Sequence, residues 1–194
     1  MGKKYKILLL LVLLLVLLLV LLLTWLFFLR KNTKVKFKYN GTNSFKYKLV
    51  IVAIFKNEAV SMKEWLQHYM RQGVEHFYMI DNGSTDNWKK ETEGSPVTIY
   101  TEKDGGQTEN YNNYCLDEVK RNSEWVMVVD LDEFMYARKG YKTISEYLDS
   151  LDKDIGQIIV DWKYFGSNWH VKQPNSIIKG FTKRNNMDSN WREI

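Results

Sequence analysis

Three carboxylates follow an apolar run of strand length near the middle of the chain. Residues 125–129 are Trp-Val-Met-Val-Val, and Asp130, Asp132 and Glu133 come directly after them. Side chains two residues apart on a strand point to the same side, so we expect Asp130 and Asp132 to project together. Carboxylates held this close repel each other unless a cation lies between them. A divalent ion that carries a diphosphate would satisfy them, because phosphate oxygens complete its ligand shell. The alternative is an acidic turn that merely ends a strand.

The elements that would position these carboxylates alternate along the chain. Apolar runs rich in β-branched residues predict strands over residues 49–55, 76–80, 97–100, 125–129 and 156–161. Helices are predicted over residues 61–73, 107–120 and 143–151. We expect Ser61 to cap the first helix, with Glu64 at the reciprocal position of a capping box and Gly73 at its end. This alternation predicts an α/β fold with a mostly parallel sheet flanked by helices.

Polar segments follow three of the predicted strands, where ligands of parallel sheets bind. These segments are Lys56–Glu58, Asp81–Asp86 and Asp130–Asp132. Their convergence at one edge of the sheet would build a single binding site. Asn57 and Glu58 could instead cap the next helix, and residues 81–86 could be an ordinary turn, because Asn, Gly, Ser and Asp favour turns.

The histidines and the single cysteine offer few further candidates. Cys115 has no second cysteine with which to form a disulfide or a zinc cluster, and we expect a small core residue rather than a nucleophile. His68 and His76 fall within predicted elements and are expected to be structural. His170 lies in a loop rich in Gly, Ser and Asn, and it is the histidine that we consider functional.

The first 48 residues differ in composition from the rest. They contain ten Lys/Arg and no Asp/Glu, whereas the remainder contains 18 Lys/Arg and 23 Asp/Glu. The net charge of +5 is therefore a property of the N-terminal arm. Because the rest is mildly acidic and has no basic stripe, we expect no nucleic-acid partner.

Residues 7–29 are almost entirely Leu and Val, and as a helix they are long enough to cross a lipid bilayer. We expect a permanent signal anchor rather than a cleaved signal peptide, because the apolar run is long and no small-residue cleavage site follows it. The sequence thus predicts a basic tail over residues 1–6, an anchor over 7–29, a basic stem over 30–47 and a folded domain over 48–194.

From about residue 49 to 184 the chain resembles glycosyltransferases of the GT-A fold, in particular glycosyltransferase family 92 and the related family 2-like group. The resemblance is carried, in chain order, by residues 53–58, 63–66, 73–78, 81–87, Gln107, Tyr111, Cys115, Trp125, 130–134, Trp162, 165–167 and His170. The segment Asp81–Asp86 is shared by many family 2 enzymes, whereas the ordered series is specific.

The resemblance implies a Rossmann-like GT-A domain that moves a sugar from a nucleotide-sugar donor, such as UDP-galactose or another UDP-sugar, to a glycan or glycoprotein acceptor. It implies that Asp81 contacts the nucleotide base. Asn57, Glu58, Asn82 and Asp86 would line the nucleotide pocket.

The same resemblance implies which residues bind a metal ion and which loop faces the donor sugar or the acceptor. Asp130 would lie near the ribose or the metal, and Asp132 would bind Mn²⁺ or Mg²⁺. The loop with His170 would face the donor sugar or the acceptor. Such enzymes are usually type II single-pass membrane proteins with a catalytic domain in the lumen of the Golgi or secretory pathway. The larger number of Lys and Arg residues after the apolar run would instead keep the following domain in the cytosol, so both orientations stay open.

The general base is the least determined part of the site. Relatives usually continue beyond the pattern seen here, so we expect a C-terminally truncated domain. Asp161, Asp188 and Glu193 are the remaining carboxylate candidates. An alternative function is a catalytically incomplete relative that binds a nucleotide sugar and acts as a binding or assembly partner. A metal phosphohydrolase is disfavoured because clustered His/Asp ligands are lacking, and a P-loop nucleotidase because its motif is absent.

Overall fold

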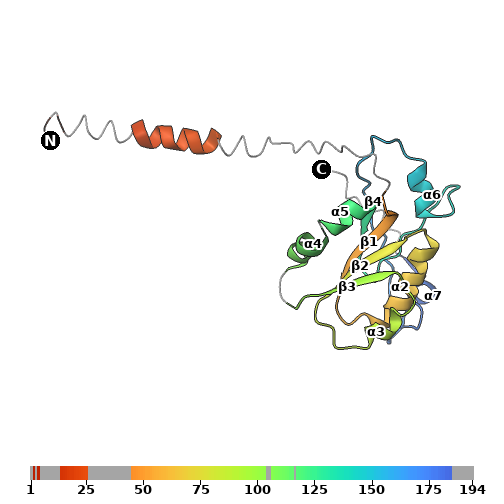
Figure 1. Cartoon of the computed structure of the whole chain (residues 1–194). Coiled ribbons are helices and arrows are strands. Elements are labelled where there is room, and N and C mark those ends of the chain that lie inside the picture. Colours follow the sequence, from red (N-terminus) through yellow and green to blue (C-terminus); the bar gives the residue numbers. More distant parts are fainter. Residues whose placement is uncertain are drawn as a thin grey trace. The chain divides into compact units, whose positions relative to one another are not determined.

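The computed structural model describes residues 2, 4, 14–25, 45–103, 106–115 and 117–184 (Figure 1). The contacts divide the chain into two units, Met1–Asn43 and Ser44–Ile194. In the first unit, residues 14–25 form a helix whose side chains are exposed. The rest of the predicted anchor over residues 7–29, and residues 30–44 of the predicted stem, lie outside the described residues. Among the helices that are described, none has both the length and the apolar character needed to cross a membrane.

The second unit contains a parallel sheet of four strands. These are β1 (Tyr47–Phe55), β2 (His76–Asp81), β3 (Val97–Thr101) and β4 (Ser123–Val128), arranged in the order β3-β2-β1-β4. Strands β1 and β2 are almost continuously apolar because helices cover both faces of a parallel sheet. The predicted α/β class and these four strands are confirmed.

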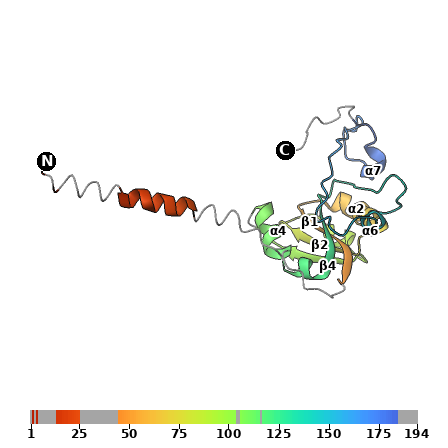
Figure 2. The same ribbon diagram turned by 90° about the horizontal axis from the view of Figure 1, so that it is seen from above.

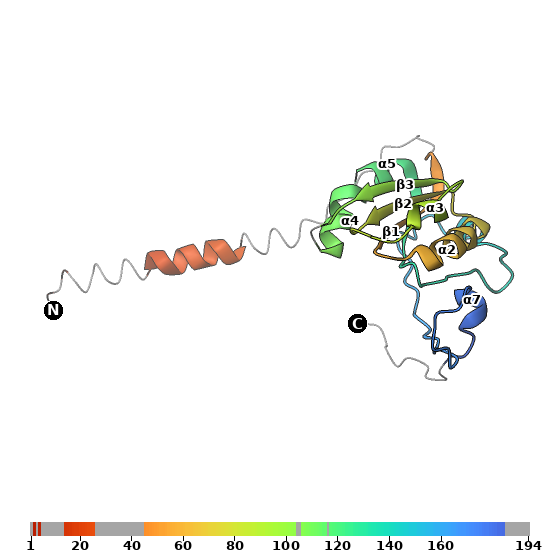
Figure 3. The same cartoon turned by 90° about the horizontal axis from the view of Figure 1, so that it is seen from below.

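Helices cover the two faces in separate groups (Figures 2 and 3). On one face α2 (Ala59–Arg71), α3 (Trp88–Glu91) and α6 (Ile144–Asp149) pack on the sheet through a cluster of large side chains that includes the fully buried Trp65 and Phe77. On the other face lie α4 (Gln107–Cys115) and α5 (Glu118–Asn122). The short helix α7 (Ile177–Gly180) follows later in the chain.

Helix α2 ends as predicted but begins differently. Gly73 follows its last turn with φ of +90°, and a Cβ atom at this position would lie 2.5 Å from Cβ of Ser145, so only glycine fits. The predicted cap at Ser61 is wrong, because the helix already begins at Ala59. Ser61 is buried in the first turn, and its hydroxyl donates to the carbonyl oxygen of Glu58 at 3.1 Å. The predicted capping partner, Glu64, instead accepts hydrogen bonds from Ser176 and Ile177.

Two other predicted elements differ from the structure. The helix predicted over residues 107–120 is divided into α4 and α5. The strand predicted over residues 156–161 is absent, and this part of the chain is exposed irregular backbone, with Ile159 84% exposed. A strand requires a neighbour with which to pair, and among the described residues β4 pairs with β1 alone.

Candidate functional site

A cleft of about 400 Å³ opens at the carboxyl ends of β1 and β4. Its walls are formed by Ile54, Phe55, Lys56, Glu58, Asn82, Gln107, Asp130, Leu131 and Asp132. The chain passes from β1 outward to β2 and β3, and then returns to β4 on the opposite side of β1. The cleft therefore lies where the strand order reverses, which is the usual position of ligand sites in open α/β sheets.

The register of the strands explains why the sheet opens here. Strand β1 pairs with β2 as far as Phe55 opposite Asp81, but it pairs with β4 only as far as Val52 opposite Val128. The backbone N–H of Ile54 has no ladder partner on β4 and donates instead to the hydroxyl of Tyr111 on α4, at 3.2 Å. The last residues of β1 thus form one wall of the cleft.

The acidic residues lie in a turn that follows β4. Strand β4 ends at Val128, and the backbone N–H of Glu133 donates to the carbonyl oxygen of Asp130 at 3.1 Å. Leu131 is buried in the core, whereas Asp130 and Asp132 on either side of it are exposed and line the cleft. Their two carboxylates accept no hydrogen bond from any residue that the structure describes. The turn therefore leaves both carboxylates available to a ligand.

Negative charge is concentrated at this end of the sheet. Burial, together with the charges of Asp132, Asp86 and Asp130, raises the pKa of Glu58 above its usual value. Burial and the charges of Asp130 and Asp132 likewise raise the pKa of Glu133. The smaller part of each shift, which comes from the neighbouring carboxylates, reflects mutual repulsion that a cation in the cleft would offset.

The described residues do not enclose a metal ion by themselves. Among them, no three or more His, Cys, Asp or Glu side chains are grouped closely enough to hold one. The donor set of Asp130 and Asp132 instead suits a hard divalent cation that takes its other ligands from phosphate oxygens and water, as Mg²⁺ commonly does.

Two buried aromatic residues of α2 hold the acidic turn in place. The indole nitrogen of Trp65 donates to the carbonyl oxygen of Asp130 at 2.9 Å. The hydroxyl of Tyr69 donates to the carbonyl oxygen of Glu133 at 3.1 Å and accepts from the N–H of Met135 at 2.9 Å. Burial raises the pKa of Tyr69, so its hydroxyl remains a donor. Neither residue was assigned this role from the sequence, although a buried indole or phenol usually requires a polar partner.

Asn57 connects the loops that follow β1 and β2. Its own N–H donates to Oγ of Ser84 at 3.0 Å, and its side-chain oxygen accepts from the N–H of Thr85 at 2.8 Å. Its backbone is in the left-handed region, with φ of +59°, which asparagine tolerates better than most residues. Asn57 is not among the residues that line the cleft, so its position is that of a connector behind the cleft wall.

The other predicted nucleotide contacts divide into two groups. Asn82 lines the cleft, as Glu58 and Asp130 do. Asp81 is buried, and its carboxylate accepts from the N–H of Ser84 at 2.8 Å. Asp86 accepts from the N–H of Ala59 at 2.8 Å and thereby caps α2, while its other oxygen is buried with no partner among the described residues. Asp81 and Asp86 therefore organise the loops around the cleft.

The cleft contains side chains to which sequence reasoning gave no role. Lys56 provides a positive charge within the same lining as the acidic turn. Gln107, at the start of α4, also lines the cleft, and its amide nitrogen lies 3.3 Å from the hydroxyl of Tyr111. Lys56 belongs to the polar segment that follows the first strand, and Gln107 is one of the residues that carry the family resemblance. Their residue types alone did not distinguish them from ordinary surface residues.

The predicted catalytic residues that the structure describes, Asp161 and His170, are not brought to the cleft. Asp161 is exposed on irregular backbone, and the ring of His170 packs edge-on against Phe181 with 6.0 Å between the ring centroids. Neither lines the cleft. Asp188 and Glu193 lie outside the described residues, as does the side chain of Cys115.

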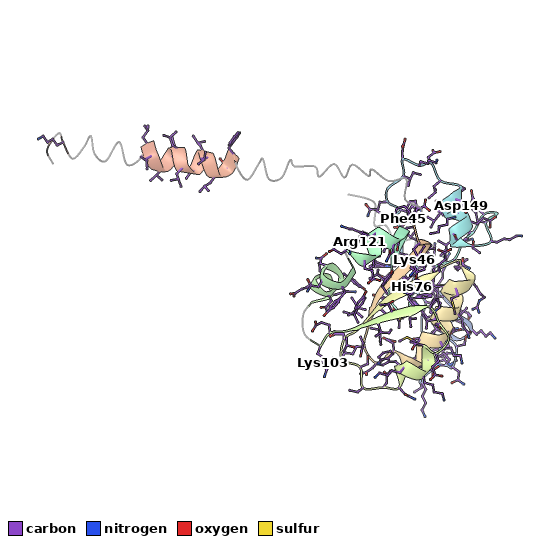
Figure 4. The ribbon with its side chains drawn as sticks, viewed as in Figure 1. Phe45, Lys46, His76, Lys103, Arg121 and Asp149 are labelled. Carbon is purple, nitrogen blue, oxygen red and sulfur yellow. The ribbon has the colours of Figure 1, made fainter. Side chains whose placement is uncertain are left out.

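His68 and His76 have the structural roles that were expected of them. His68 bonds through Nε2 to the carbonyl oxygen of Met135, at 2.7 Å. His76 stacks on Tyr47 with 4.9 Å between the ring centroids, and its Nε2 lies 2.8 Å from Oγ1 of Thr98. Figure 4 shows His76 beside Lys46 at the amino ends of the strands, whereas Lys103 follows the carboxyl end of β3.

The family model and the related proteins that match this chain carry the same family description. The family model described as glycosyltransferase family 92 matches residues 100–192. A glycosyltransferase family 92 protein of Oryza sativa subsp. japonica is 25% identical over 146 residues, which cover 71% of this chain and 25% of that protein. A second, from Arabidopsis thaliana, is 24% identical over 166 residues, which cover 72% of this chain and 27% of that protein. The chain spans about a quarter of the length of these curated relatives. The sequence of residues 49–184 resembles glycosyltransferase family 92, and the family model and both relatives confirm this resemblance.

Proposed function

We propose that the chain forms the donor-binding part of a metal-dependent glycosyltransferase of the GT-A fold. In this proposal it transfers a sugar from a UDP-sugar, such as UDP-galactose, to a glycan or glycoprotein acceptor. The observation that carries the proposal is the pair of exposed carboxylates, Asp130 and Asp132, on a cleft at the point where the strand order reverses. The cleft volume of about 400 Å³ is within the range of small-molecule sites.

The lining offers complementary contacts to each part of such a donor. Asp130 and Asp132 would hold Mn²⁺ or Mg²⁺, which when bound offsets the charge of the departing diphosphate as a Lewis acid. The Lys56 ammonium group is a donor for phosphate oxygens. The amides of Asn82 and Gln107 can bond to the hydroxyl and carbonyl groups of the nucleoside.

The acceptor side would come from the segment after α6. Sugar transfer requires a group that takes the proton of the acceptor hydroxyl. Asp161 and His170 on residues 156–184 are the described candidates, and Asp188 is a further one. Because both described candidates are exposed and outside the donor cleft, their approach to a donor depends on where this segment is held.

The composition of residues 7–29 supports a bilayer anchor, and we place the catalytic domain in the lumen of the secretory pathway as a type II membrane protein. This placement has a specific consequence at the cleft. Asn82-Gly83-Ser84 is an acceptor sequence for N-glycosylation, and Asn82 lines the cleft. We expect Asn82 to carry no glycan, and mass spectrometry that finds one there contradicts the nucleotide role.

Binding and turnover of defined donors test the proposal. Titration calorimetry of the purified full chain with UDP-galactose, other UDP-sugars and GDP-sugars is expected to show binding of a UDP-sugar with Mn²⁺ and none with EDTA. Slow hydrolysis or sugar transfer should accompany this binding. Metal-independent binding, or no binding of any sugar nucleotide, contradicts the proposal.

The alternative function is a nucleotide-sugar-binding relative without catalysis, because the described catalytic candidates, Asp161 and His170, lie outside the cleft. It predicts the same Mn²⁺-dependent binding with no turnover. Activity that appears only in a longer reading frame would favour this alternative.

A further inference from the structure

The carboxylate of Glu64 joins two segments that are 112 residues apart in the chain. The hydroxyl of Ser176 donates to Oε1 of Glu64, and the backbone N–H of Ile177 donates to Oε2, each at 2.6 Å. Each carboxylate oxygen thus receives one short, charge-assisted hydrogen bond. The hydroxyl of Ser176 also accepts from the N–H of Lys179 at 3.1 Å, so the same serine caps α7.

We call residues 156–184 the acceptor-side segment, and its internal hydrogen bonds lie within residues 165–184. Phe165 and Arg184 form an antiparallel bridge, and the side chain of Asn168 bonds to both Thr182 and Lys183. Among the described residues, the two hydrogen bonds that connect this segment to the rest of its unit both end on Glu64. The segment also contributes no side chain to the two hydrophobic clusters of the core.

The acceptor-side segment has a defined local shape. Asn168 and Trp169 are consecutive residues with positive φ, +52° and +66°, a conformation that costs energy and persists only when neighbouring contacts maintain it. The bonds of the Asn168 side chain, at 2.9 Å each, are such contacts. Gly180 packs directly against the ring of Pro174, where any Cβ atom would collide. A segment with internal order moves as a unit, so one external anchor is sufficient to set its position.

The anchor belongs to α2, the helix that begins directly after a residue of the cleft lining. Glu58 lines the cleft and immediately precedes α2, and Glu64 lies six residues further along, or about 9 Å at the rise of an α-helix. The neighbouring Trp65 and Leu66 are fully buried, so this part of α2 cannot shift without disturbing the core. Figures 2 and 3 both show α7 beside α2.

We propose that Glu64 is a positioning residue for sugar transfer, whose carboxylate holds the ordered part of the acceptor-side segment, with His170, in a fixed relation to the donor cleft. This inference rests on the proposed function. Without the two bonds, the segment keeps its internal contacts but loses its position relative to bound donor. Loss of Glu64 should therefore weaken acceptor use while leaving donor binding intact.

Three variants of the full chain separate this role from general stability. Glu64→Ala removes both acceptors, and Glu64→Gln retains one oxygen acceptor. Glu75→Gln is the matched control, because the carboxylate of Glu75 also accepts a backbone hydrogen bond, from Lys48 at 2.6 Å, but does not contact the acceptor-side segment. Amide exchange of β1 and β2 in each variant shows whether the sheet is folded.

Hydrogen exchange is the first readout. We expect the amide of Ile177 and the peptides of residues 165–184 to exchange about tenfold faster in Glu64→Ala, because a charge-assisted bond is lost, with Glu64→Gln in between and Glu75→Gln at the wild-type rate. Unchanged exchange of this segment in Glu64→Ala overturns the inference, whatever the enzymatic activity.

Kinetics with UDP-galactose, Mn²⁺ and a mixture of methyl hexopyranosides as acceptors is the second readout. In Glu64→Ala we expect the ratio of transfer to hydrolysis to fall about tenfold, with the Kd of UDP-galactose unchanged. Faster exchange with an unchanged ratio means that Glu64 is only structural, and this also overturns the inference. A wild-type chain that neither binds nor converts any UDP-sugar contradicts the proposed function, and the exchange result then decides separately whether Glu64 holds the segment.

Discussion

The indole nitrogen of Trp65 donates a hydrogen bond to the backbone carbonyl oxygen of Asp130, with 2.9 Å between the two atoms. Trp65 is fully buried in the core between α2 and the sheet, whereas the carboxylate of Asp130 faces the cleft. This bond is one of the contacts that connect the core to the turn that carries both candidate metal ligands. A change that is far from solvent can therefore alter the geometry of the site.

Replacing Trp65 by phenylalanine tests this connection. The substitution removes the indole donor from the carbonyl oxygen of Asp130, which keeps its bond from the N–H of Glu133. We expect loss of this one bond to lower the free energy of unfolding by about 0.5–1.5 kcal/mol. Mn²⁺-dependent binding of UDP-sugar should weaken as well, because the turn loses one of the hydrogen bonds that position it, while the bonds of Tyr69 remain. Urea denaturation and titration calorimetry measure the two effects.

Trp88→Phe is the control for this experiment. Trp88 is also buried and packs edge-on against Phe55, but it does not bond to the acidic turn. We expect it to lose packing stability without a specific loss of metal-dependent binding. Equal effects of the two variants on binding would show that the bond to Asp130 has no special role.

Asp132→Asn removes one of the two exposed charges of the cleft. The side chain is exposed and accepts no bond from the described residues, so the free energy of unfolding should change by less than about 0.5 kcal/mol. Binding of UDP-sugar in the presence of Mn²⁺ should be abolished. Asp154→Asn, at an exposed position outside the cleft, should leave binding intact. Undiminished binding in Asp132→Asn would defeat the proposed metal role.

The raised pKa of Glu58 predicts a pH dependence of stability. Burial and three neighbouring carboxylates raise this pKa in the folded protein, so the folded state holds the proton more tightly than the unfolded state. The resulting contribution to stability is fully present below the unfolded pKa and is lost as the pH rises through the folded pKa.

Glu58→Gln should therefore increase the free energy of unfolding at pH 7 and have little effect near pH 4. Because Glu58 is only partly buried, we expect a gain below about 1 kcal/mol. Denaturation curves at the two pH values measure the difference. If Glu58→Gln raises the free energy of unfolding more at pH 4 than at pH 7, the pKa of Glu58 is not raised in the folded protein.

Two substitutions of Asn57 separate the contributions of its backbone conformation and of its side-chain hydrogen bond to the free energy of unfolding. Asn57→Gly keeps the positive φ but removes the bond to Thr85, and we expect a loss of about 1 kcal/mol. Asn57→Ala removes the same bond and also places a Cβ-bearing residue in the left-handed region, which costs about 1–2 kcal/mol more. Thermal or urea unfolding of both variants gives the difference. Equal stability of the two variants would mean that the backbone conformation is not under strain.

Much of the sheet and the position of the site were predictable from the sequence. Long apolar runs such as residues 49–55 can only be accommodated where both faces of a strand are covered, so they indicate a parallel sheet. Once the strands are parallel, the polar residues that follow them must meet at one edge. This reasoning placed Glu58, Asn82, Asp130 and Asp132 together, and all four line the cleft.

The predictions that were wrong or incomplete concern residues whose structure or role depends on a partner far away in the sequence. The run at residues 156–161 is apolar enough for a strand, but pairing depends on a neighbour that a local pattern does not reveal. Ser61 and Glu64 have the spacing of a capping box, yet the first turn of α2 is capped by Asp86 from another loop. The roles of Trp65 and Asn57 likewise depend on contacts with residues far away in the chain.

The hydroxyl of Tyr111 has a consequence for how this scaffold can diversify. It completes β1 where a neighbouring strand would otherwise be needed, and it comes from the same helix as Gln107. On the side of α4, the cleft is therefore bordered by the surface of a helix and not by a paired strand. Side chains on a helix surface can be substituted without breaking hydrogen bonds of the sheet. Substitutions in α4, by evolution or by protein engineering, can therefore change which ligand the cleft prefers. The strands of the sheet keep their register when such residues change.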